Sequence, residues 1–370
     1  MALLRLLADD LTGALDTGVE FVGLCGPLEV CWTQSLPSTL SESLILDSGT
    51  RELGKAQVVP IIERLVPALY DATIAFKKVD SLMRGEWAAE LAACLRPGRW
   101  SSCIVAPAFV YQGRRTRGGQ QFARTQDGSW SPVGGNILAL LAAEGIDAHQ
   151  GQLEKELPPG VSVFNAESED DLDRVVAVGR SAQGSVLWVG SGGLARALAR
   201  GHEVSVSPRL QAPVLGLFGS DQPATAAQLA ACGSQVVTLT EGAPDHARDV
   251  ERRLAADGVV LARFGLPSGL SRTDAAQRIA RELAAMTLQL QPPGTLIVAG
   301  GETLRALCVA IGAQSLKLAG QIMPGLPRSV IQGGRWSDVE VISKSGSLGP
   351  ANLWADLLRD NHLVPDRIGT

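Results

Sequence analysis

The chain has 370 residues, of which 45% are hydrophobic and 19% are charged, a composition typical of a globular protein long enough for two hydrophobic cores. Its 33 basic and 38 acidic residues give a formal net charge of −5, which argues against nucleic acid or an anionic membrane as a partner. No apolar run approaches the roughly 18 residues that a membrane-spanning helix needs, and the amino terminus has no signal-peptide pattern, so we expect a cytoplasmic protein.

Cysteine and histidine usage also limits the kinds of metal and catalytic site that the chain can form. The six cysteines lie far apart without a CxxC pair, which indicates buried, reduced thiols. Only four histidines occur, and none lies in an acidic or glycine-rich cluster. We therefore expect no zinc site, no histidine-based catalytic triad and no metal site built from protein ligands.

Short apolar runs alternate with longer segments of helical period along the whole chain. The runs that predict strands are, in chain order, Leu3–Ala8, Leu44–Asp47, Thr73–Lys77, Cys103–Ala106, Val186–Val189, Val214–Phe218, Gln235–Leu239, Val259–Arg263, Thr295–Ala299 and Val339–Lys344. Helices are predicted over Glu169–Ala182 and Ala275–Leu290, and a further helix after Gly301 is expected to end at Gly312. The glycine-rich stretch 128–135 is expected to form a long turn. This alternation predicts an α/β fold with mainly parallel sheets covered by helices.

One segment has the composition of a linker. Residues 201–213, GHEVSVSPRLQAP, follow a predicted helix, contain two prolines and precede a new strand. We therefore expect two domains, residues 1–205 and 213–370, each a mainly parallel sheet flanked by helices, with a ligand cleft between them.

The distinctive motifs begin where predicted strands end. In the first half these are ADDLTG (8–13), KKVDSLMRG (77–85), APAFVYQGRRTRGG (106–119) and GSGG (190–193); in the second half they are GSDQPAT (219–225), GGET (300–303) and KSGSLG (344–349). Ligands of open parallel sheets bind outside the carboxyl ends of the strands, so these loops are candidate ligand-binding segments.

The first-half motifs combine acids with cations, which suits a small polyhydroxy acid. Lys78, Arg84, Arg114 and Arg115 could neutralise a carboxylate, while Asp9, Asp10 and Asp80 could accept hydrogen bonds from hydroxyl groups. A carboxylate beside a phosphoryl acceptor can also take its proton. Simpler roles remain open: helix capping by one aspartate of the 9–10 pair, capping by Asp80 and Ser81, and a solvated surface for Arg115 and Arg117.

The second-half motifs have the composition of phosphate-binding loops. Glycine lets backbone amides approach an anion closely, and the helix that follows each loop presents a partially positive end. Pro223 suits a first helical turn just after Ser220, and Lys344 adds a cation beside small residues. Each loop alone could be no more than a tight strand–helix turn. Together, with neither GxGxxG nor GxxxxGK[ST] present, they predict a nucleotide site outside those two motifs.

The motifs in this order, together with PGLP (324–327), resemble those of the four-carbon acid sugar kinases, a family of threonate, erythronate and 3-oxo-tetronate kinases. The likeness covers about residues 3 to 356. Two positions depart from the family pattern: GSDQ stands where GSCS is common, and DSLMRG stands where DSTLRG is common, so that Leu82 replaces a threonine.

The resemblance implies transfer of the ATP γ-phosphoryl group, with Mg²⁺, to a hydroxyl of a four-carbon sugar acid, with Asp9 or Asp10 orienting or deprotonating that hydroxyl. It implies substrate contacts at Asp9, Asp10, Lys78, Asp80, Ser81, Arg84 and Arg114. The implied nucleotide contacts are Gly219, Ser220, Gln222, Gly300, Gly301, Glu302, Thr303, Lys344, Ser345 and Gly346.

The sequence is also compatible with two other functions. The altered GSDQ loop would suit a ligand-sensing relative with weak catalysis. Alternating strands and glycine loops would also suit an NAD(P)-linked sugar-acid dehydrogenase, although the dinucleotide fingerprint is absent. A homodimer is the default expectation for the assembly.

Overall fold

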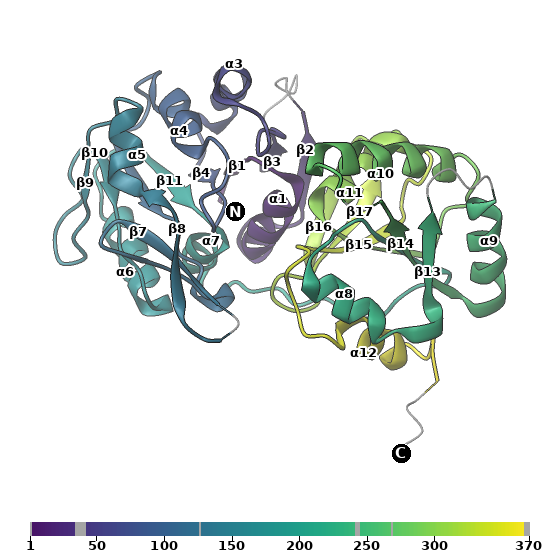
Figure 1. Cartoon of the computed structure of the whole chain (residues 1–370). Coiled ribbons are helices and arrows are strands. Elements are labelled where there is room, and N and C mark those ends of the chain that lie inside the picture. The colour runs from purple at the N-terminus through teal and green to yellow at the C-terminus, as the bar shows by residue number, and fades with distance from the viewer. Residues whose placement is uncertain (1, 34–41, 126, 241–244, 268, 366–370) are drawn as a thin grey trace. The chain divides into compact units, whose positions relative to one another are not determined.

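The protein forms two compact units, Met1–Val204 and Ser205–Thr370. The structure is a computed structural model and describes residues 2–33, 42–125, 127–240, 245–267 and 269–365 (Figure 1). No helix among these residues is both long and apolar enough to cross a lipid bilayer.

The first unit is built on a parallel sheet. Its strands lie in the order β2-β3-β1-β4-β11-β5-β10-β9, and each neighbouring pair is parallel. Their bounds are β1 (Leu4–Ala8), β2 (Leu28–Trp32), β3 (Leu44–Asp47), β4 (Ile74–Lys78), β5 (Ser102–Ala106), β9 (Ala148–Gln150), β10 (Gly160–Val163) and β11 (Val186–Gly190). The central strands β1, β4 and β5 are buried along their whole length, as expected for a parallel sheet covered on both faces.

Two groups of helices accompany this sheet. Helices α3 (Lys55–Leu65), α4 (Trp87–Leu95) and α5 (Ile137–Ala143) contact one another in turn, and their apolar side chains share a core with Leu7, Leu46, Ala75 and Val105 of the sheet (Figure 1). Helices α1 (Leu11–Gly18), α6 (Glu169–Arg180) and α7 (Gly192–Leu198) form the second group. The short helices are η1 (Val19–Phe21), α2 (Val22–Cys25), η2 (Val66–Leu69) and η3 (Val110–Gln112).

A small antiparallel sheet is inserted between β5 and α5. It consists of β6 (Arg114–Arg117), β7 (Gln120–Arg124) and β8 (Trp130–Asn136). The predicted long turn over 128–135 is therefore wrong for most of its length, because a strand begins at Trp130. The glycines that favoured a turn occupy an irregularity: the register shifts between Gln120 and Gln121, and Gly134 has a left-handed φ of 63°.

The second unit has a mixed sheet in the order β13-β14-β12-β15-β18-β17-β16. Strands β12 (Val214–Phe218), β13 (Val236–Thr240), β14 (Val259–Gly265), β15 (Thr295–Ala299) and β18 (Glu340–Lys344) pair in parallel, and β17 (Pro327–Gln332) is antiparallel to both β18 and β16 (Ser315–Gln321). The helices are α8 (Pro223–Ala230), η4 (Gly233–Gln235), α9 (His246–Asp257), α10 (Arg272–Thr287), α11 (Gly301–Ala310) and α12 (Leu353–Asp360).

The predicted fold class, an α/β protein with mainly parallel sheets flanked by helices, is confirmed. All ten predicted strands are present, with ends that differ by at most two residues from those expected. Gly312 follows the end of α11 with a φ of 69°, as its predicted capping role requires. The six cysteines are free thiols, of which Cys31 is half-buried and the others are buried.

Candidate functional site

The first-half acids and cations gather at the carboxyl edge of three neighbouring strands. Strand β1 lies between β3 and β4, so the residues that follow these three strands meet at one edge of the sheet. Lys78 ends β4, and its ammonium lies 3.3 Å from Asp9 Oδ1 and 3.1 Å from Asp10 Oδ1. Asp80, two residues further on, accepts hydrogen bonds from Arg84 Nε at 2.6 Å and Nη2 at 3.1 Å.

Arg51 links all three aspartates. Its guanidinium donates to both carboxylate oxygens of Asp9, reaches Asp10 Oδ1 at 2.7 Å and lies 3.3 Å from Asp80 Oδ1. Arg51 lies in none of the motifs predicted to bind a ligand. A signal was present, because Arg51 follows the correctly predicted strand Leu44–Asp47 in the segment DSGTR, at the same edge as the other motifs.

Asp10 also caps helix α1. Its side chain accepts a hydrogen bond from the backbone N–H of Gly13 at 3.1 Å. Gly13 matters for a second reason: a Cβ atom there would lie 1.9 Å from the Lys78 ammonium. The bare helix backbone thus leaves the space in which the Lys78 ammonium sits between the two aspartates. Capping and ion pairing therefore occur together at Asp10.

The ionisation of the aspartates follows from these contacts. Burial opposes ionisation of Asp9, but the charges of Lys78 and Arg51 outweigh it and hold the pKa of Asp9 well below its usual range. Burial also opposes ionisation of Asp80, but the Arg84 hydrogen bond and the nearby cations lower the pKa of Asp80 to about 2. Asp16, further along α1, differs: burial raises the pKa of Asp16 to about 7.

Arg114 and Ser81 enter the site differently from what the sequence suggested. Arg114 Nη1 donates to the carbonyls of Gln112 at 2.8 Å and Gly113 at 3.0 Å. Burial lowers the pKa of Arg114, and the charge of Asp80 opposes that shift. Ser81 takes part through its carbonyl, which accepts a hydrogen bond from Gln121 Nε2 at 3.0 Å. Arg117, with Arg115, forms an ion pair with Glu167 instead.

The turn that carries Asp80 and Arg84 is held by the small sheet. Buried Gln121 of β7 donates to Ser81 O and to Pro107 O at 3.1 Å, and its own carbonyl accepts from Thr116 Oγ1 at 2.6 Å. Within the turn, Met83 is buried and has a left-handed φ of 59°, which is unusual for a bulky side chain. Strain of this kind persists only where the surroundings impose it, and Gln121 is one such restraint.

In the second unit, three glycine-containing loops meet at another carboxyl edge. Strands β12, β15 and β18 are neighbours, and the loops at Gly219–Gln222, Gly300 and Ser345–Gly346 follow them. A Cβ atom at Gly219 would lie 2.3 Å from Thr303 Oγ1, and one at Gly346 would lie 2.1 Å from Ser220 Oγ. The absence of side chains at these glycines therefore permits the close approach of the loops.

Each loop is tied to a helix. Gly300 has a φ of 106° and immediately precedes α11, whose first turn contains Gly301, Glu302 and Thr303. Pro223 is the first residue of α8, as expected. The backbone N–H of Gln222, the residue before it, donates to Ser220 Oγ at 3.3 Å. From α8, Thr225 Oγ1 donates to Gly346 O at 2.7 Å.

Lys344 is the buried cation of this edge. Its ammonium donates to the carbonyls of Ser345 at 2.9 Å and Gly346 at 3.2 Å. Within the described part of the chain it has no carboxylate partner, and burial lowers the pKa of Lys344 to about 8. A buried ammonium without a counter-charge, beside glycine-containing loops and a helix start, is suited to an incoming phosphate.

Each half of the chain matches a known protein-family model. A family model described as a sugar-binding N-terminal domain matches residues 4–135, and one described as a nucleotide-binding C-terminal domain matches residues 215–353. The chain is 30% identical to a D-threonate kinase from Bordetella bronchiseptica, covering 98% of this chain and 97% of the relative. The chain belongs to the four-carbon acid sugar kinase family.

Other members of this family support the assignment. A D-threonate kinase from Cupriavidus necator is 32% identical over 88% of this chain and 89% of its own length, and a D-erythronate kinase from Heliobacterium modesticaldum is 26% identical over 93% of each chain. The crystal structure of a Salmonella typhimurium protein has the same fold, with a TM-score of 0.73 and 18% identity over 97% of this chain and 100% of that one. The resemblance seen in the motifs is thus confirmed.

Proposed function

We propose that this acid sugar kinase homologue transfers the γ-phosphoryl group of ATP to a hydroxyl of a four-carbon sugar acid of the threonate, erythronate or 3-oxo-tetronate type. The observation that carries the proposal is the charge cluster at the edge of β3, β1 and β4. Four cations (Arg51, Lys78, Arg84 and Arg114) surround the three carboxylates of Asp9, Asp10 and Asp80.

This charge balance suits a monocarboxylate ligand with several hydroxyls. The cluster has one more cation than carboxylates, and Asp16, with its pKa raised to about 7, offsets that excess only in part. Arg84 and Arg114, the cations least committed to the Asp9–Asp10 pair, would bind the substrate carboxylate. The aspartates, together with Ser81, would accept hydrogen bonds from the hydroxyls.

Asp9 and Asp10 would play different parts in the reaction. Asp9 is held by two cations with a strongly lowered pKa, so it is a weak proton acceptor and would orient a hydroxyl. The side chain of Asp10 is 27% exposed against 4% for Asp9. We assign to Asp10 the acceptance of the hydroxyl proton as the new O–P bond forms and the bond to the ADP oxygen breaks.

The second unit would bind the nucleotide. The backbone amides of Gly219, Ser220 and Gly346 and the start of α11 at Gly300–Thr303 would contact phosphate oxygens, and Lys344 would supply the positive charge. Mg²⁺ would accompany ATP and neutralise charge on the phosphates, taking most of its ligands from phosphate oxygens and water, as this ion generally does. This assigns acid-sugar binding to residues 1–205 and nucleotide binding to residues 213–370.

A coupled ADP-release assay tests the proposal directly. Purified protein with ATP and Mg²⁺ is supplied in turn with D-threonate, D-erythronate and a 3-oxo-tetronate, beside a reaction without acceptor. The proposal expects ADP release that depends on one of these acids. Stabilisation by the ligands without turnover would instead indicate a sensing protein, and reduction of NAD⁺ or NADP⁺ by the acid would indicate a dehydrogenase.

The role of Asp10 has its own test. Asp10→Asn keeps the cap acceptor but removes the proton acceptor, so turnover should fall at least about 100-fold, the usual contribution of general-base catalysis. The affinity for ATP should change little, because the nucleotide would bind the other unit. Asp170→Asn, at an exposed site on α6, is the matched control. Equal turnover of Asp10→Asn and the control would contradict the assignment.

A further inference from the structure

A cavity of about 580 Å³ lies at the opposite edge of the first unit's sheet, where β4, β5 and β11 begin. It is bounded by the segments Leu69–Ala75, Arg99–Trp100 and Gly184–Val186, which lead into those three strands. The charge cluster, in contrast, follows the carboxyl ends of the strands. The cavity is thus separate from both ligand sites proposed above, and its volume lies within the usual range of small-molecule sites.

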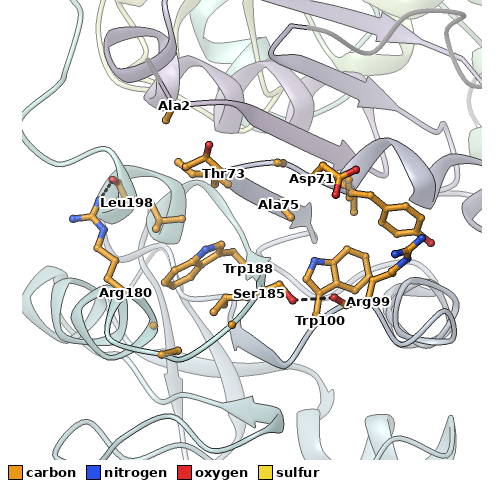
Figure 2. A pocket seen from close by; sticks show the side chains of 18 of the residues that line it. Ala2, Asp71, Thr73, Ala75, Arg99, Trp100, Arg180, Ser185, Trp188 and Leu198 are labelled. Carbon is orange, nitrogen blue, oxygen red and sulfur yellow. Dashed lines mark hydrogen bonds between the residues drawn. The ribbon is translucent and has the colours of Figure 1, made fainter.

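Three aromatic side chains line the cavity: Tyr70, Trp100 and Trp188. Figure 2 shows the indole of Trp188 and that of Trp100 along its floor. Trp188 is only 5% exposed, and its ring lies against α6, where a Cβ atom at Gly179 would be 2.2 Å from it. Tyr70 packs against Trp100 with ring centroids 5.8 Å apart. Such surfaces favour flat rings, which gain stacking contacts beyond simple apolar burial.

Two arginines stand at the sides of this aromatic floor. In the view of Figure 2, Arg180 lies beyond Trp188 and Arg99 lies beyond Trp100. Arg180 donates one hydrogen bond, from Nη2 to Leu198 O at 2.7 Å, and Arg99 lies over the Tyr70 ring at 5.0 Å. Within the described residues neither guanidinium has a carboxylate partner, so donors remain on both.

Hydrogen bonds of the Ser185 side chain join the segment before β11 to the segment before β5. Ser185 Oγ donates to Arg99 O at 2.8 Å and accepts from the N–H of Ser101 at 3.2 Å. The lining contains one carboxylate, Asp71, against the two arginines, so the cavity carries an excess of one positive charge.

We propose that this cavity is a second ligand site, which binds a planar aromatic molecule carrying a single anionic group. The ring would stack on Trp100 beside the small exposed part of Trp188, and the carboxylate or phosphate would accept hydrogen bonds from Arg180. This site goes beyond the phosphoryl-transfer function and does not depend on it. A ligand here would contact the start of β4, the strand whose other end carries Lys78 of the charge cluster.

Calorimetric titration of the full chain with anthranilate, an aromatic monocarboxylate, tests the proposal. The expected result is binding of one molecule per chain, with no binding of benzyl alcohol, which has the ring without the charge, or of acetate, which has the charge without the ring. Competition by AMP and by benzoate then distinguishes a phosphate-bearing ligand from a carboxylate-bearing one. The AMP titration is run with Lys344→Met, which weakens the proposed nucleotide site.

Substitution of residues that line the cavity tests whether the ligand binds there. Arg180→Gln should weaken anthranilate binding about tenfold, the loss expected for one charge-assisted hydrogen bond, and Trp100→Ala should weaken it at least as much. Arg174→Gln, on the exposed side of the same helix, should bind as the unmodified chain does. Thermal unfolding of each variant shows that it is folded. Absence of anthranilate binding, or equal binding by Arg180→Gln and Arg174→Gln, would overturn the proposal.

Discussion

At the scale of single residues, Gly13 leaves the space on helix α1 that the Lys78 ammonium occupies. A methyl group there would lie 1.9 Å from Lys78 Nζ and 2.5 Å from Asp10 Oδ1. Gly13→Ala favours the helix itself by about 0.5–1 kcal/mol, so the fold should survive. The flexible Lys78 ammonium would have to move, and kcat/KM for the sugar acid should fall at least about tenfold, as expected when about 1.4 kcal/mol of transition-state stabilisation is lost.

Steady-state kinetics and thermal unfolding check this prediction together. Gly54→Ala is the matched control, because that glycine precedes α3 with a φ of −78° and no atom lies within 4 Å of the place that an added methyl group would take. If Gly13→Ala lowers the melting temperature strongly, or leaves kcat/KM at the control value, the glycine does not serve Lys78 in the way we describe.

Asp16 makes a second prediction at this scale, about pH. Burial raises the pKa of Asp16 from 3.8 to about 7, so between these values the native state holds a proton that the unfolded state has released. This contribution to stability is complete at about pH 4 and is lost as the pH rises to about 7. Asp16→Asn cannot lose a proton, so its melting temperature relative to the unmodified chain should rise across that window. Parallel melting-temperature curves from pH 4 to 8 would contradict the assignment.

At the scale of elements, the small sheet β6-β7-β8 restrains the turn that carries Asp80 and Arg84. Gln121→Glu keeps the size of the side chain but removes the donor to Ser81 O and one of two donors to Pro107 O, which also accepts from Ser191 Oγ at 2.9 Å. The cost is about 1–3 kcal/mol. KM for the sugar acid should rise and kcat should fall, whereas the affinity for ATP should stay the same. Gln57→Glu on the exposed face of α3 is the control. A loss of stability without any change in KM would reduce Gln121 to a purely structural residue.

The elements also show what could be read from the sequence. Strands such as Leu4–Ala8 and Val214–Phe218 are continuous apolar runs, because both faces of a parallel sheet are covered, and these were predicted correctly. β8 was missed because its glycines fill a bulge, and β16 (SLKLAGQ) because it mixes polar with apolar residues. Arg51 was missed because its three partners are contributed by segments 29 to 42 residues away, and the strand order that unites them is not a local property.

At the scale of the whole molecule, the two units should bind their ligands through separate residues. Arg84→Gln removes a half-exposed guanidinium from the charge cluster, and Lys344→Met removes the buried ammonium from the glycine loops. We expect Arg84→Gln to weaken binding of the sugar acid about tenfold or more with ATP binding unchanged, and Lys344→Met to do the reverse, since each removes one charge-assisted contact. Calorimetric titration of each variant with each ligand alone measures both effects.

The pH dependence of nucleotide binding sharpens this last prediction. Because burial without a counter-charge lowers the pKa of Lys344 to about 8, the free protein loses this positive charge as the pH rises through 8. A bound phosphate favours the charged ammonium, so ATP affinity should fall between about pH 7 and 9 in the unmodified chain and stay flat in Lys344→Met. Arg84→Gln, which keeps Lys344, should show the same decline as the unmodified chain. A decline that persists in Lys344→Met would place the titrating group elsewhere and remove Lys344 from the phosphate site.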